Sequence, residues 1–137
     1  MGFEMNEVWK VYGNDIIPID NYEVIYVSQG CEGTKIVLEG NNYNLKIRFW
    51  SVDSLRATDE GRRIRTYHEV ESIQDYRKDF IGLPIFTVDN SEFIAWVAKE
   101  SAGIYTDSIH YAIMTINDIV DIVAPFPPEI IVRTIID

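Results

Sequence analysis

The feature that most constrains the fold is a strict alternation of apolar and polar residues in the first half of the chain. The segment NYNLKIRFW (42–50) shows it most clearly, because every second residue from Tyr43 to Phe49 is apolar and the residues between them are polar. Side chains that alternate in this way point to opposite faces of an extended strand. The pattern is typical of an antiparallel sheet that buries one face and exposes the other.

Similar patterns predict further strands, which are separated by turn-forming residues. They lie at residues 7–12, 22–28, 34–39, 62–71, 109–116, 119–124 and 129–136. Asn117 and Asp118 are predicted to form a two-residue hairpin turn. The strands on either side of that turn are apolar on both faces, which indicates a central or helix-covered position. Prolines precede the last segment and mark it as an edge strand.

One segment, NSEFIAWVAKESAG (90–103), has the period of a helix, because Phe93 and Val97 fall on one side of it. Asp89 is the predicted N-cap, in a capping box with Glu92, and Gly103 suits the C-terminal end. We therefore expect an α+β fold: a mainly antiparallel sheet of about seven strands, as a meander or partial barrel, with one principal helix at about 90–102 on a face. Residues 1–137 are expected to form a single globular domain.

The charge balance restricts the kind of partner, because 22 acidic residues outweigh 12 basic ones and give a formal charge of -10. Such a surface repels phosphate backbones and attracts basic proteins, although it also simply keeps a protein soluble. The single cysteine, Cys31, cannot form an intramolecular disulfide, and no secretory signal or membrane-length apolar run is present. We expect a cytoplasmic protein with no nucleic-acid or membrane partner.

Positive charge gathers in the segment RATDEGRRIRTYHE (56–69), which holds four of the seven arginines. In a strand over 62–71, the neighbours His68 and Glu69 would point to opposite faces, so they could not act as a base and its orienting group or share a metal. His68 would then lie at the margin of the core beside Val70. The arginines would pair with glutamates on the exposed face of the sheet.

The alternative for this segment is an anion site in which Arg62, Arg63 or Arg65 grips a carboxylate or phosphate. A wider version of it is a ligand pocket or active site between the sheet and the helix. The residues at its mouth would be Arg63, Arg65, Tyr67 and Glu69, with Glu69 as a general base.

Motifs of known chemistry are missing from the sequence. His68 and His110 have no third ligand at zinc spacing, and no Walker, nucleophile-elbow or dinucleotide pattern occurs. The negative charge of Glu32 next to Cys31 would disfavour the thiolate form and weaken the thiol as a nucleophile. We predict no catalytic residue, no metal and no cofactor. A non-enzymatic protein is favoured, although the sequence does not decide whether the protein is an enzyme.

Exposed aromatic and acidic side chains are the candidates for contact with a basic partner. They are Trp50, Tyr105, Asp107, Tyr111, Asp118 and Asp121. Trp50 breaks the alternation of its strand, so a bulge that returns it to the core is preferred. If no bulge occurs, Trp50 is an exposed aromatic side chain of the kind found at interfaces.

In size, sign of charge and lack of catalytic motifs, the chain resembles the inhibitor and immunity proteins that bacteria pair with cationic nuclease toxins. The resemblance implies an acidic binding protein that occludes a basic partner, and no functional residue is carried over from it. Two alternatives stay open: a small-ligand-binding domain or enzyme that uses the arginine segment, and a domain that self-associates through the C-terminal strand.

Overall fold

The computed structural model describes residues 6–73, 82–104 and 107–135. Within them lie nine strands: β1 (Val8–Val11), β2 (Glu23–Gly30), β3 (Gly33–Glu39), β4 (Tyr43–Phe49), β5 (Ser54–Asp59), β6 (Ile85–Asp89), β7 (Ile109–Met114), β8 (Asp118–Ala124) and β9 (Glu129–Thr134). The helices are η1 (Glu60–Arg62), α1 (Ile64–Glu69) and α3 (Glu92–Glu100). All paired strands are antiparallel, which confirms the predicted α+β class.

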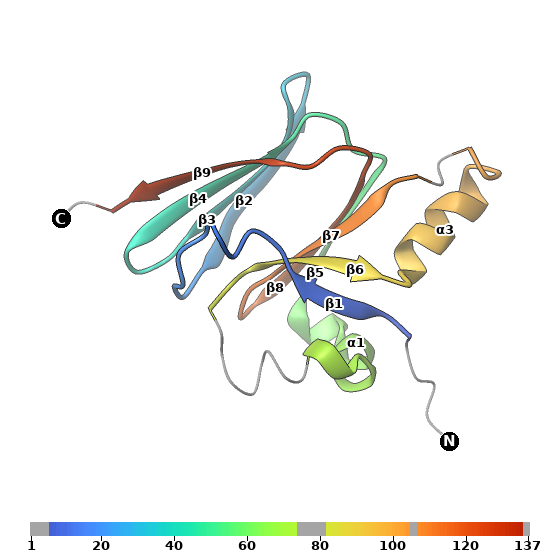
Figure 1. The fold of residues 1–137 in the computed structure, drawn as a ribbon, viewed down its shortest axis with the longest axis horizontal. Coiled ribbons are helices and arrows are strands. Elements are labelled where there is room, and N and C mark those ends of the chain that lie inside the picture. The colour runs from blue at the N-terminus through green and yellow to red at the C-terminus, as the bar shows by residue number, and fades with distance from the viewer. Residues whose placement is uncertain (1–5, 74–81, 105–106, 136–137) are drawn as a thin grey trace.

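The strands form two sheets that face one another, in place of one meander or partial barrel (Figure 1). One sheet has the order β1-β6-β7-β8-β5 and the other has the order β2-β3-β4-β9. Leu45 and Ile47 of β4 share one apolar core with Ile113 and Ile122 of the five-stranded sheet. The last strand, β9, is an edge strand, as its prolines predict.

The helices α1 and α3 cover the opposite face of the five-stranded sheet (Figure 1). Phe93 and Val97 of α3 pack on Val123, while Val70 and Ile73 pack beside Ala112. β7 and β8 are therefore buried on both sides, as their apolar sequences predict. Among the described residues, no helix has the length and apolar character needed to cross a membrane.

The predicted helix is present as α3, but its N-cap is not Asp89. Ser91 occupies that position, and its hydroxyl accepts a hydrogen bond from the backbone N–H of Ile94 at 3.0 Å. Asp89 ends β6 and forms an ion pair with Lys10 at 2.7 Å. The C-terminal cap is also not the predicted residue: Ser101 caps α3, and Gly103 follows two residues later with a φ of 83°.

The prediction of a strand over 62–71 is wrong. The chain makes β5 first, turns where the Asp59 carboxylate accepts the N–H of Gly61 at 2.8 Å, and then forms η1 and α1. Thr66 of α1 is buried, and so are Val70, which is extended and ends the helix, and Ile73 beyond it. His68 is exposed, because a position two residues on from the buried Thr66 lies on nearly the opposite side of the helix.

Three local features also differ from the predictions. A bulge between Val24 and Tyr26 turns Tyr26 outward. Trp50 is 58% exposed, with the Arg48 guanidinium 4.2 Å from its ring centroid, so no bulge returns Trp50 to the core. The backbone N–H of Thr115 donates to the carbonyl of Asp118, which places the hairpin turn at residues 116–117, one residue earlier than predicted. The strands β5 and β6 were not predicted from the sequence.

Candidate functional site

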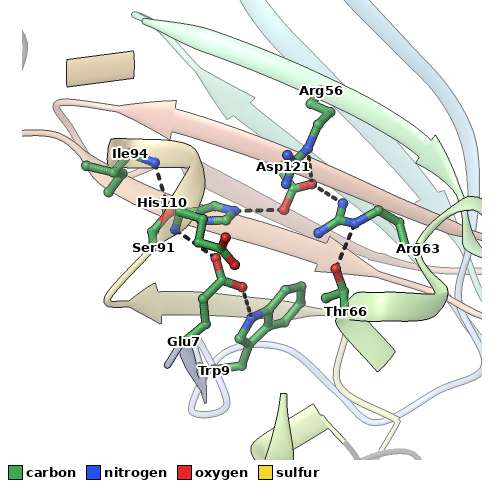
Figure 2. Close-up of polar contacts among 10 residues, drawn as sticks. Glu7, Trp9, Arg56, Arg63, Thr66, Ser91, Ile94, His110 and Asp121 are labelled. Carbon is green, nitrogen blue, oxygen red and sulfur yellow. Dashed lines mark hydrogen bonds and ion pairs between the residues drawn. The ribbon is translucent and has the colours of Figure 1, made fainter. Parts of the chain in front are cut away.

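Asp121 lies at the centre of a polar network on the helix-covered face of the five-stranded sheet (Figure 2). Its side chain is 0% exposed, and both of its oxygens are occupied. His110 Nε2 lies 2.7 Å from Oδ1, while Arg56 Nε and Arg63 Nη1 lie 3.0 and 2.5 Å from Oδ2. A buried carboxylate requires partners of this kind, because an uncompensated charge in the interior is very costly.

Strand register brings these residues together. In β5 and β8, Arg56 and Asp121 are directly paired, and in β7 and β8, Ala112 is paired with Asp121. His110 is two residues from Ala112, so it is the diagonal neighbour of Asp121 on the same face. Arg63 comes from the short connection between η1 and α1, and its Nε donates to Thr66 Oγ1 at 3.1 Å.

The buried His110 links this network to the start of α3. Its Nδ1 lies 2.7 Å from Ser91 Oγ. Because that oxygen already accepts the N–H of Ile94, the Ser91 hydroxyl hydrogen is free to donate to Nδ1. In this arrangement the Nε2–H group of His110 donates to Asp121, and both ring nitrogens of His110 have a partner.

Glu7 is a second buried carboxylate beside the site. Its Oε2 accepts the backbone N–H of Glu92 at 2.9 Å, and its Oε1 accepts the indole N–H of Trp9 at 3.2 Å (Figure 2). A carboxylate that accepts the first N–H of a helix also interacts favourably with the helix dipole. Glu7 therefore ties β1 to the beginning of α3.

The charge state of Asp121 follows from its neighbours. Burial on its own would raise the pKa of this carboxyl group. The hydrogen bond from His110, followed by the positive charges of Arg63 and Arg56, outweighs burial and lowers the pKa of Asp121 to about 2. At neutral pH, Asp121 is therefore the anion that holds two guanidinium groups in place.

A pocket of about 710 Å³ lies beside this network, between β5, α1 and the first turns of α3. The residues that give its wall chemical character are four arginines, two glutamates and two aromatic residues: Arg56, Arg62, Arg63, Arg65, Glu7, Glu92, Phe93 and Trp96. The guanidinium carbon of Arg56 lies 4.5 Å from the centroid of the Phe93 ring, in cation–π geometry. The pocket thus combines fixed positive charge with aromatic surface.

The three arginines that sequence analysis offered as an anion site, Arg62, Arg63 and Arg65, all line this one pocket, and Arg56 joins them. The other two residues proposed for a pocket mouth do not line it. Tyr67 packs with the hydrophobic cluster around Trp9, and Glu69 forms an i,i+4 ion pair with Arg65 at 3.0 Å.

The predicted partner-binding residues do not form one surface. Tyr111 and Asp121 are buried, which corrects the expectation that they contact a partner: the Tyr111 ring packs edge-on against Tyr12 in the core. Trp50 and Asp107 are exposed, whereas Asp118 is partly buried in β8. Tyr105 lies outside the described residues.

Ser91, His110 and Asp121 together resemble the hydrogen-bonded chain that activates a nucleophile. Their surroundings favour a structural role. Ser91 Oγ serves as the cap of α3, Asp121 is shared with two arginines, and none of the three residues lines the pocket. Among the described residues, no group of three or more His, Cys, Asp or Glu side chains is placed to hold a metal ion.

Comparison with known proteins adds no assignment. No family model, curated protein or solved structure matches this chain.

Proposed function

We propose that this protein is a non-enzymatic binding protein that receives an anionic group, a carboxylate or a phosphate, in the arginine pocket. The observation that supports this most directly is that two guanidinium groups, those of Arg56 and Arg63, share a single oxygen of the buried Asp121. One carboxylate neutralises one of the two positive charges. The remaining positive charge is held on a preorganised pair of side chains.

The same pair retains unused hydrogen-bond donors. A guanidinium group carries five N–H donors. In the part of the chain that the structure describes, Arg56 donates through Nε alone, and Arg63 donates through Nε and Nη1. The other N–H groups remain for a ligand, and planar donors of this kind suit the paired oxygens of a carboxylate or phosphate.

Charge around the pocket favours the same conclusion. Four arginines and two glutamates line a pocket in a chain whose formal charge is -10. Arg65 shares its charge with Glu69 and Glu92, but Arg62 is exposed and makes no ion pair with any described residue. Arg62 is therefore the arginine whose removal should affect a ligand without disturbing the fold.

The test is titration of the protein with inorganic phosphate and with acetate, followed by NMR of the arginine side chains. Arg62→Gln and Arg56→Gln should each weaken binding by about tenfold or more, because each removes a charge-assisted hydrogen bond. Arg133→Gln is the matched control, since Arg133 is an exposed arginine on β9 of the other sheet. If both pocket variants bind as the control does, the anion site is wrong.

A second candidate is an acidic, cytoplasmic binding protein that occludes a basic partner, in the manner of inhibitor and immunity proteins. The observation that favours it is the uneven distribution of charge: four of the 12 basic residues line the pocket, so the rest of the surface is more acidic than the composition suggests. Acidic surfaces speed the encounter with cationic proteins.

This candidate is tested by the rate of association with a cationic nuclease at increasing ionic strength. The association rate should fall by about tenfold or more between low and physiological salt, because screening shortens the reach of the attraction. A rate that does not respond to salt would remove the electrostatic basis of this candidate. The Arg62→Gln variant should keep the salt dependence, which separates the two proposals.

A further inference from the structure

We infer that the anion received by the arginine pocket belongs to a planar, ring-bearing ligand whose ring stacks on Trp96. The inference rests on the proposed anion site and adds the ligand class: a nucleoside monophosphate or an aromatic carboxylate. The two share one chemistry, a flat π-face joined to a single anionic group.

Trp96 is placed for contact with a ligand rather than for the core. It lies on α3, lines the pocket and remains 54% exposed. The apolar face with which α3 meets the sheet is supplied by Phe93 and Val97, which pack on Val123. The indole is stacked on the Phe93 ring at a centroid distance of 6.0 Å and an interplanar angle of 26°, which fixes its orientation.

The aromatic and cationic parts of the pocket form one continuous wall. The Arg56 guanidinium lies 4.5 Å from the Phe93 centroid, and the Trp96 ring lies 6.0 Å from the same centroid. The guanidinium and the indole are therefore no farther apart than the sum of these two distances. A nucleoside monophosphate can span such a separation with its ring at one end and its phosphate at the other.

The other exposed tryptophan shows what distinguishes Trp96. Trp50 is exposed to a similar degree, but the Arg48 guanidinium covers its ring at 4.2 Å. Among the described residues, Phe93 is the one aromatic partner of Trp96, and no cation lies over the indole. One π-face of Trp96 is thus left for a ligand, and stacking on such a face accepts many kinds of ring.

The glutamates restrict the number of negative charges on the ligand. Glu92 is about half exposed at the pocket, and Glu7 lies beside it with both oxygens already bonded. Additional phosphates would be repelled by these carboxylates. A volume of about 710 Å³ is also within the usual range for sites that hold one small organic ligand. We therefore expect a monophosphate to bind more tightly than a triphosphate.

The test measures the affinities of inorganic phosphate, adenosine, AMP and ATP by calorimetry, and of acetate against 2-naphthoate. AMP should bind about tenfold more tightly than inorganic phosphate because of the stacked base, and more tightly than ATP. Tighter binding of AMP than of inorganic phosphate identifies the ligand as a nucleotide. If the only gain in affinity is that of 2-naphthoate over acetate, the ligand is an aromatic carboxylate. Trp96→Leu should remove the gain and leave the affinity for phosphate unchanged, while Trp50→Leu is the matched control.

Two results would overturn the inference. If phosphate binds and neither ring-bearing ligand gains affinity, the ring site is wrong and the anion site stands. If the gain survives in the Trp96→Leu variant, the ring does not stack on this indole. Failure of every anion to bind would instead refute the proposed function itself.

Discussion

The five-stranded sheet has two buried faces of opposite character. On the face toward the four-stranded sheet, Ile113, Val120 and Ile122 pack in the largest apolar cluster of the described residues. On the face toward the helices, the same strands place His110 and Asp121 in a polar network with two arginines. Strands β7 and β8 supply both sets of side chains, because alternate residues point to opposite faces.

The two faces are stabilised in different ways. An apolar face is stabilised by burial alone and needs no particular partner. A buried ionic network is often no more stabilising than apolar residues of similar size, yet it fails badly when one member is removed. The helix-covered face is therefore energetically more costly to bury than the other face. In the proposed function, the network offsets this cost because it holds Arg56 and Arg63 in place for an anion.

The largest effect is expected from Asp121→Asn, which removes the central charge and keeps the shape of the side chain. Arg63, whose side chain is only 10% exposed, would lose its counter-charge. We expect the free energy of unfolding to fall by about 3–5 kcal/mol, measured by urea denaturation. The control is Asp118→Asn on the same strand, where the change should stay within about 0.5 kcal/mol. Equal losses for the two variants would contradict a central role for Asp121.

A smaller loss of folding stability is expected when the pH is lowered. The pKa of Asp121 is about 2 in the folded protein, below its ordinary value of 3.8. A carboxyl group whose pKa is lowered by folding stabilises the folded state at pH values above its ordinary pKa. This stabilisation is lost as the pH falls from about 4 to about 2. The loss should be about 2 kcal/mol, measured as a fall of the urea midpoint over that range.

Asp121→Asn should weaken this pH dependence without abolishing it, because Asp20 contributes in the same direction. Burial raises the pKa of Asp20, but the backbone N–H groups of Asn42 and Asn21 that donate to it outweigh burial and lower it. An unchanged acid response in the Asp121→Asn variant would show that Asp121 is not paired as described.

The smallest effect is expected on the apolar face. Ile122→Val removes one buried methylene group and should lower the free energy of unfolding by about 0.5–1.5 kcal/mol. Since this substitution changes no titratable group, the loss of unfolding free energy should be the same at pH 7 and at pH 3. A loss that changes with pH would mean that the two faces are coupled and that the comparison between them is too simple.

Much of the sheet could be predicted from the sequence, because its signal is local. The alternation in β4 correctly places Leu45, Ile47 and Phe49 in the core. The apolar strands β7 and β8 are covered on both faces, as predicted. In β4 the burial of a residue follows from its position in a period of two, whereas in β7 and β8 it follows from the continuous apolar run.

The site could not be predicted in the same way. With the turn one residue later, Asp121 would lie opposite Met114 rather than Ala112, and His110 would no longer be its neighbour. Turn propensity alone does not resolve a shift of this size. One signal was available: His110 and Asp121 are polar residues in strands that are otherwise almost entirely apolar, and such residues need buried partners.

The structure of the arginine segment (56–69) also could not be predicted from local sequence. Its alternation fits a strand, but Thr66, Val70 and Ile73 also fit a helix, and both readings are consistent with the local sequence. Whether the segment forms a strand or a helix depends on whether a sheet edge is available for it. The edge beside β8 is already occupied by β5, so the segment does not pair there. The helix then directs Arg63 and Arg65 into one pocket.

By itself, the sequence determined the α+β class, the principal helix, the edge position of β9 and the gathering of arginines in one segment. Only the tertiary structure decided that two of them, Arg56 and Arg63, meet the buried Asp121 of a distant strand, next to a pocket that Trp96 also lines. The physical reason is that period and charge are properties of neighbouring residues. A buried ion network depends on strand register and on helix placement, which the whole core sets together.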